Sequence, residues 1–247
     1  MNNQAIELAV LDMAGTTLRD AGEVEACFAQ SIREEGLNIS DDWIKSVQGW
    51  SKHTVFQEMW RILIGAEHPE YHERVEHSYA GFKKILEAYY RSQPIQPTEG
   101  CQETFAWLRE QGIKIALTTG FYREVADLIL HRLGWLQGLD DNYRAQGAAS
   151  TIDLSLTSDM VPEGRPAPDM IFLAMQTFGI EDPQRVVKVG DTPSDLEAGL
   201  RANCRYSIGL TNGTHTRAQL TLHPHTALLD HLGQLPAYLM QILSPVS

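Results

Sequence analysis

The spacing of hydrophobic residues changes along the chain and predicts two kinds of structure. Residues 6–12 form a short apolar run that ends in Asp12, which predicts a buried strand. From about Glu23 to Tyr90 the apolar residues recur every three or four positions, as they do on one face of a helix. The first part of the chain therefore predicts one strand followed by a helical segment.

After Gly100 the pattern alternates between short apolar runs and helical spacing. We expect helices over 101–111 and 122–133, and strands over 113–119, 185–190 and 205–210. Such alternation is typical of a parallel sheet covered by helices. We therefore predict an α/β fold with a doubly wound, Rossmann-like core formed by residues 1–18 and 97–247. Residues 19–96 are predicted to be an inserted helical cap domain, placed to close over a site beside the first strand.

Composition narrows the function classes. The formal net charge of −12 argues against nucleic acid or an anionic membrane as a partner. No apolar run is long enough to span a bilayer, and the first residues resemble no signal peptide. Three scattered cysteines are expected to be reduced thiols, so a cytoplasmic protein is expected. The four histidines after Thr214 are not spaced for one metal site, and we expect a solvated, loop-rich surface there.

Candidate functional residues follow the predicted strands. Asp12 is followed at once by a small-residue turn, and open α/β folds place their sites at such strand ends. Thr119 ends the second predicted strand before Gly120, an arrangement that suits an anion. Asp191 and Asp195 form a Gly-Asp-x-x-x-Asp pattern after another apolar run, and their carboxylates are ligands that Mg²⁺ prefers. Taken singly, each has a plain structural alternative, such as a turn-capping aspartate or a strand-ending threonine.

The order of these residues resembles the four motifs of the haloacid dehalogenase superfamily. The resemblance implies that Asp12 is a nucleophile that forms an aspartyl-phosphate. Thr119 and Arg165, the latter in Gly-Arg-Pro, are implied to bind the transferring group. The resemblance also implies a Mg²⁺ ion that is held by Asp12, the Ala14 carbonyl and Asp191. Asp195 is implied to support these ligands. Thr16 and Gly120 are implied to contact the substrate.

One departure points to a particular branch. Most phosphatases of the superfamily carry a second Asp two residues after the nucleophile, where this chain has Ala14. The Asp-x-Ala-Gly-Thr form resembles the phosphonatase branch, which cleaves a carbon–phosphorus bond. In that branch a cap lysine forms a Schiff base with a substrate aldehyde, so the leaving carbon needs no acid. The segment Gly49-Trp50-Ser51-Lys52 resembles its Gly-x-x-Lys, which implies a catalytic Lys52 and a substrate contact at Gly49.

The residues around the aldehyde differ from that branch. Gly22, Gln48, Val55 and Phe121 stand where phosphonatases have Cys, Met, His and Tyr. Three interpretations therefore stay open. They are a Mg²⁺-dependent phosphonate hydrolase, a phosphatase acting on a small phosphate monoester, and a protein that binds a phospho-ligand without turnover. The intact motifs favour the first two. The expected partner is a small anionic phosphonate or phosphate, and a homodimer through the cap is compatible with the pattern.

Overall fold

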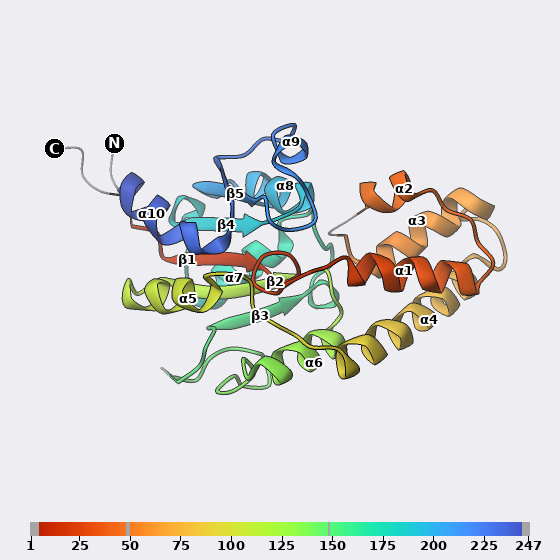
Figure 1. Cartoon of the computed structure of the whole chain (residues 1–247), viewed down its shortest axis with the longest axis horizontal. Coiled ribbons are helices and arrows are strands. Elements are labelled where there is room, and N and C mark those ends of the chain that lie inside the picture. The colour runs from red at the N-terminus through yellow and green to blue at the C-terminus, as the bar shows by residue number, and fades with distance from the viewer. Residues whose placement is uncertain (1–4, 48–49, 148, 244–247) are drawn as a thin grey trace.

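The computed structural model describes residues 5–47, 50–147 and 149–243. Its centre is a parallel six-stranded sheet with the strand order β3-β2-β1-β4-β5-β6 (Figure 1). The strands are β1 (Leu8–Asp12), β2 (Lys114–Thr119), β3 (Leu154–Thr157), β4 (Val186–Gly190), β5 (Tyr206–Leu210) and β6 (Ala227–Leu229). This topology confirms the predicted α/β fold with a parallel sheet.

Helices cover both faces of the sheet because the central strands are apolar on both sides. In β1, Ala9 and Leu11 belong to one buried cluster, whereas Leu8 and Val10 belong to the other. The first cluster includes side chains of α5 (Cys101–Glu110), α6 (Arg123–Leu133) and α10 (Leu235–Leu243). The second includes side chains of α7 (Asp169–Phe178) and α8 (Pro193–Arg201). The sheet is therefore buried between two helical layers.

Strand β1 lies between β2 and β4, and this position determines where its last residue lies. Asp12 is paired with Thr118 of β2, and Leu11 with Val189 of β4. Since all three strands run in the same direction, their carboxyl ends meet at one edge of the sheet. The residues that follow β1, β2 and β4 are thereby brought together.

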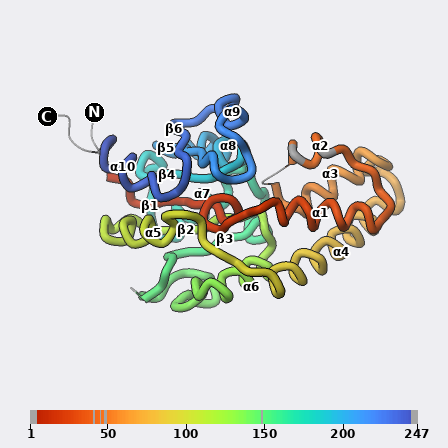
Figure 2. The backbone as a smooth tube through the Cα atoms, viewed as in Figure 1, coloured from red at the N-terminus to blue at the C-terminus, as the bar shows by residue number. Residues whose placement is uncertain are grey.

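Four helices between β1 and β2 form a separate layer beyond this edge (Figure 1, Figure 2). They are α1 (Glu23–Glu34), α2 (Asp41–Ser46), α3 (Lys52–Ile64) and α4 (Tyr71–Ser92). Three buried aromatic rings connect α1, α3 and α4. The ring centroid of Phe28 in α1 lies 5.1 Å from that of Phe56 in α3 and 6.0 Å from that of Phe82 in α4. Such edge-to-face contacts stabilise helix packing. These helices correspond to the segment expected to form the cap.

The two chain segments that enter and leave this helical layer lie side by side. The amide of Arg19 donates to the carbonyl of Gln96 at 2.9 Å, and the amide of Thr98 donates to the carbonyl of Thr17 at 3.1 Å. The layer is thus attached through one short pair of backbone segments. We propose residues 19–96 as the cap domain on this basis, and such paired linkers are where a hinge would act.

The C-terminal part of the chain agrees with the sequence prediction only in part. His223 and His225 are exposed and lie outside helices and strands, as expected, but His215 is buried at 8% exposure, and α9 (Arg217–Leu220), β6 and α10 give the region regular structure. Strand β6 has only three residues, too few for the spacing of its apolar residues to indicate a strand in the sequence. Strand β3 and helix α7 were also not predicted. Among the described residues no helix is long and apolar enough to cross a bilayer.

Candidate active site

A pocket lies between the carboxyl edge of the sheet and the helical layer. Residues from both sides line it: Asp12, Ala14, Asp20, Val24, Glu25, Trp50, Lys52, Thr119, Gly120, Phe121, Arg165, Thr192 and Thr214. It therefore brings together the four catalytic residues that the sequence analysis selected, Asp12, Lys52, Thr119 and Arg165.

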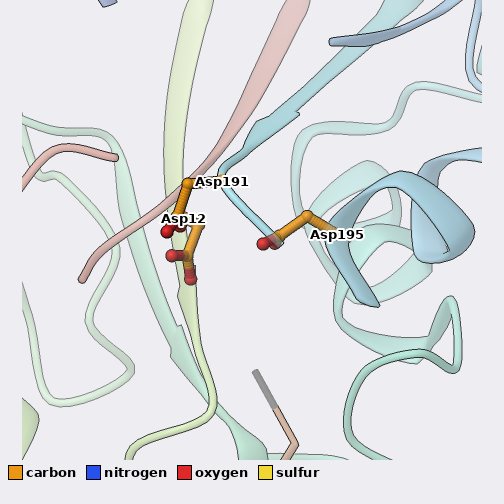
Figure 3. Close-up of side chains that lie close together, drawn as sticks. All are labelled: Asp12, Asp191 and Asp195. Atoms are coloured by element: carbon orange, nitrogen blue, oxygen red, sulfur yellow. The ribbon is translucent and has the colours of Figure 1, made fainter. Parts of the chain in front are cut away.

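Three buried carboxylates gather at the sheet edge (Figure 3). Asp12, Asp191 and Asp195 each place an oxygen within 4.8 Å of the others. Asp12 ends β1, Asp191 directly follows β4, and Asp195 lies in the first turn of α8. The Asp195 position is stabilised by a capping box, in which its carboxylate accepts the Thr192 amide at 3.3 Å and its own amide donates to the Thr192 hydroxyl oxygen at 3.3 Å. Strand ends and a helix cap thus hold the three groups close despite their mutual repulsion.

Two buried cations offset this negative charge. Arg165 Nη1 lies 2.7 Å from Asp12 Oδ1 and also contacts Asp195 Oδ1. Lys188 Nζ lies 2.8 Å from Asp195 Oδ1 and donates to the Thr118 hydroxyl at 3.3 Å. Although burial opposes ionisation, these cations hold the pKa of Asp195 well below its usual value. Asp195 is therefore the anion that anchors Arg165 and Lys188 beside the nucleophile candidate.

Asp191 is held by donors from two loops. Its Oδ2 accepts the backbone amide and the hydroxyl of Thr214, at 2.7 and 2.9 Å, and its Oδ1 accepts the Thr16 hydroxyl at 3.3 Å. Burial and the nearby Asp195 raise the pKa of Asp191 to about 6, although the Thr214 donors oppose the rise. Thr16 is fully buried beneath Asp191, so its hydroxyl supports a ligand candidate; the substrate contact expected for it stays a prediction.

The residues at the sheet edge fit a divalent cation. Asp12 Oδ1 is buried and is contacted by Arg165 in an ion pair, and burial raises the pKa of this carboxyl to about 8 against the pull of Arg165. Gly15, with φ of 82°, and Gly213 both approach Asp191 so closely that a Cβ at either position would collide with its carboxylate. Hard oxygen donors in a space kept clear of side chains suit Mg²⁺. A bound cation would favour the ionised form of Asp12.

The end of β2 offers a hydroxyl and a turn to the pocket. Thr119 accepts the amide of Phe121 at 3.1 Å, which leaves its hydroxyl proton available to an anion. Gly120 lines the pocket, and its carbonyl accepts the Ser158 hydroxyl at 3.1 Å. Thr118 points away to Lys188, as expected for neighbouring residues of a strand.

Lys52 is the first residue of α3 and is 9% exposed. Its ammonium nitrogen lies 5.7 Å from the centroid of the Phe28 ring and has no hydrogen bond or ion pair to any described residue. Burial lowers the pKa of Lys52, Arg165 lowers it further, and Glu25 and Asp20 oppose the change. The amine is therefore displaced toward its neutral, nucleophilic form. Gly49 and Gln48 lie outside the described residues.

Comparison with known proteins agrees with this arrangement. A model of haloacid dehalogenase-like hydrolases matches residues 6–203. This chain belongs to that family.

One relative is a phosphonoacetaldehyde hydrolase of Bacteroides fragilis. It is 30% identical over 228 residues, with 86% of this chain and 79% of the relative aligned. A phosphonoacetaldehyde hydrolase of Bacillus cereus is 31% identical over 224 residues, with 85% and 77% aligned. A solved phosphonoacetaldehyde hydrolase-like protein of Oleispira antarctica shares the fold, with a TM-score of 0.71 and 19% identity over 98% of this chain and 94% of that one.

The structure of this haloacid dehalogenase-like hydrolase adds residues that the sequence analysis did not select. Lys188 interrupts the apolar run of β4, and a charged residue inside a buried strand signals a buried partner. Thr214 follows β5 in a loop with no pattern that links it to Asp191. Asp20 and Glu25 line the pocket, and only the folded chain shows that they lie near Lys52. Val55 and Phe121 are buried, at 0% and 5% exposure.

Proposed function

We propose that this haloacid dehalogenase-like hydrolase cleaves the carbon–phosphorus bond of a small phosphonate aldehyde of the phosphonoacetaldehyde type, with Mg²⁺ as cofactor. The observation that carries the proposal is Lys52, a buried amine that lines the same pocket as Asp12 and has no ion pair among the described residues. Ala14, which lines the same pocket, provides no acid for a leaving group. The phosphonoacetaldehyde hydrolases among the relatives support the same substrate class.

The chemistry at the carbon end begins at Lys52. The neutral amine attacks the aldehyde carbon, water leaves, and a protonated imine forms. This cation withdraws electrons from the adjacent carbon–phosphorus bond. When that bond breaks, its electron pair moves into the imine and produces an enamine, so the departing carbon needs no proton at that moment. The absence of an acid at Ala14 then has a chemical explanation.

The chemistry at the phosphorus end uses the residues of the sheet edge. An Asp12 oxygen attacks phosphorus as the carbon leaves, and an aspartyl-phosphate forms. Arg165 and the Thr119 hydroxyl are placed to bind the phosphorus oxygens as their charge grows. Mg²⁺ held by Asp12, the Ala14 carbonyl and Asp191 would supply further neutralisation of that charge. Water then releases phosphate from Asp12. The enamine takes a proton from water at its terminal carbon and becomes an imine again, and hydrolysis of this imine releases acetaldehyde and frees Lys52.

A second candidate is a phosphatase acting on a small phosphate monoester. The buried apolar side chains of Val55 and Phe121 favour it, because phosphonatases have polar groups at these positions around the aldehyde. In that case the phosphorus end would act alone, and Lys52 would attract the substrate by its charge.

The two candidates differ in the bond that is broken. The test is phosphorus and proton NMR of the enzyme with Mg²⁺ and phosphonoacetaldehyde, beside a panel of small phosphate esters. The proposal predicts conversion of the phosphonate signal into inorganic phosphate together with acetaldehyde, at a kcat/KM above that of every ester. Cleavage of esters with the phosphonate left intact would favour the phosphatase.

A further inference from the structure

The pocket has a carboxyl that the proposed mechanism has not used. Asp20 lies on the segment that leads from β1 into α1, and its side chain lines the pocket together with Asp12 and Lys52. Its Oδ1 accepts the amide of Gly22 at 2.7 Å, which fixes the orientation of the carboxyl group. Asp20 is therefore a positioned acidic group within the substrate pocket.

A second carboxyl, that of Glu23, lies near Asp20 but does not line the pocket. The Glu23 carboxyl lies close enough to Asp20 to raise the pKa of Asp20 by repulsion. Glu23 Oε2 accepts the amide of Ala21 at 2.6 Å, and its Oε1 accepts the Tyr90 hydroxyl at 3.4 Å. Both Glu23 oxygens thus accept a donor, and these contacts hold the Glu23 carboxyl in place. Glu23 is not among the residues that line the pocket, so Asp20 is the carboxyl of the two that faces the substrate.

Lys52 is the independent observation that connects this acid with a ligand. Its amine is nine-tenths buried, lines the same pocket, and has no hydrogen bond or ion pair to the described residues. Asp20 is close enough to raise the pKa of Lys52 against the effect of burial. An amine and a carboxylic acid that line one pocket are the two groups that imine formation from a carbonyl compound needs.

We propose that Asp20 is the catalytic acid for imine formation at Lys52, a role that rests on the proposed phosphonate hydrolase function. The Lys52 nitrogen forms a bond to the carbonyl carbon, and the π electron pair moves to the oxygen. That oxygen takes one proton from the nitrogen and one from Asp20, and it leaves as water. The products are a protonated imine on Lys52 and an Asp20 carboxylate next to it, so charge and atoms balance. The same carboxylate accepts a proton when water later hydrolyses the imine.

The protonation state of Asp20 agrees with this role. Burial raises its pKa to about 8, Glu25 and Glu23 raise it by repulsion, and the Gly22 amide opposes the rise. The titratable groups that interact electrostatically with Asp20 are Glu23 and Glu25 of α1, Lys52 of α3, and Tyr89 and Tyr90 of α4. At neutral pH Asp20 therefore holds its proton, and a general acid works best near the pH of the reaction. Imine formation should slow as the pH rises through about 8, where Asp20 loses that proton.

The test measures the rate at which borohydride traps phosphonoacetaldehyde on Lys52, from pH 6 to pH 10, in the full chain with Mg²⁺. Asp20→Asn keeps a polar side chain of similar size, whose oxygen can still accept the Gly22 amide, but has no acidic proton, so we expect trapping at pH 7 to slow by roughly 10²-fold. The decline above pH 8 should also disappear in this variant. Asp20→Glu should restore part of the rate, and Glu34→Gln, an exposed change on α1, should leave it unchanged.

Three results would overturn the inference in distinguishable ways. Trapping by Asp20→Asn at the normal rate removes Asp20 from imine formation but leaves the proposed function standing. No trapping in the unmodified protein removes the proposed function and this inference with it. Equal losses of trapping and of p-nitrophenyl phosphate hydrolysis, whose leaving group needs no acid, would show that Asp20 has a structural role only.

Discussion

The two ends of the pocket are built differently. At the phosphorus end, Asp12, Asp191, Asp195, Arg165 and Lys188 are all buried, and ion pairs and hydrogen bonds from strand ends connect them. At the carbon end, Lys52 has one aromatic contact among the described residues and lies on α3 of the helical layer, whereas Asp20 lies on the segment that leads into α1. The first end is supported by the sheet, whereas the second depends on how the helical layer lies over it.

This difference explains which residues can vary. A change in the phosphorus end leaves a buried charge without its partner, which costs several kcal/mol. A change at the carbon end meets fewer fixed contacts, and the substrate rather than the fold decides what is tolerated. Of the residues that depart from the phosphonatase pattern, Phe121 lines the pocket beside Lys52, whereas Gly22 and Val55 lie at the start of α1 and within α3. We infer that substrate choice is set at the carbon end.

The largest expected effect is at the phosphorus end. Asp12→Asn removes the oxygen that attacks phosphorus, so turnover of both phosphonates and phosphate esters should fall by ~10³-fold or more. Steady-state rates with both substrate classes measure it, and a thermal melt checks that the variant is folded. A near-normal rate on either class would mean that the two classes do not share this nucleophile.

Lys52→Arg should separate the two ends. Arginine keeps a positive charge but cannot form an imine, so activity on phosphonoacetaldehyde should fall by roughly 10²-fold or more. Hydrolysis of p-nitrophenyl phosphate should persist, because Asp12, Thr119 and Arg165 are unchanged. Lys84→Arg, an exposed lysine of α4, serves as the matched control. If both activities fall together, Lys52 positions the cap or the anion and does no covalent chemistry.

Asp195→Ala tests the charge network of the phosphorus end. The change leaves Arg165 and Lys188 buried beside a cavity without their common partner, so we expect unfolding free energy to drop by about 3 kcal/mol or more. Denaturant unfolding measures this. Exchange of a carbon-end residue, as in Lys52→Met, should cost little or nothing, because a lone buried amine is replaced by an apolar side chain. Equal losses would contradict the contrast between the two ends.

The smallest expected effect concerns the metal. Mg²⁺ should raise the melting temperature of the unmodified protein, and Asp191→Ala should abolish that rise. Thr214→Val removes the hydroxyl donor to Asp191 but keeps the backbone amide, so Mg²⁺ affinity should weaken by roughly 10-fold. Titration of the melting temperature with Mg²⁺ reads this without relying on activity. An unchanged midpoint in Thr214→Val would mean that Asp191 is not positioned by that hydroxyl.

The contrast also explains how much could be predicted from sequence. The β1, β2 and β4 strands are apolar runs that end in Asp12, Thr119 and Gly190, so period and position sufficed for the fold and for the sheet-edge residues. Strand β6 has three residues and carries no periodic signal, and the buried His215 lies in a segment that looked solvated. The positions of the Asp20 and Glu23 carboxyls depend on the backbone turn whose Ala21 and Gly22 amides donate to them. The approach of these residues to Lys52 depends on how α1 and α3 pack, and no local pattern records that.

The most direct test of the central claim is the site of covalent attachment. The enzyme is mixed with phosphonoacetaldehyde and borohydride, digested, and analysed by mass spectrometry of its peptides. The account predicts a reduced adduct on Lys52 and on no other lysine, and its loss in Lys52→Arg. Release of phosphate and acetaldehyde with no adduct on Lys52, or with the adduct on a different lysine, would contradict the account.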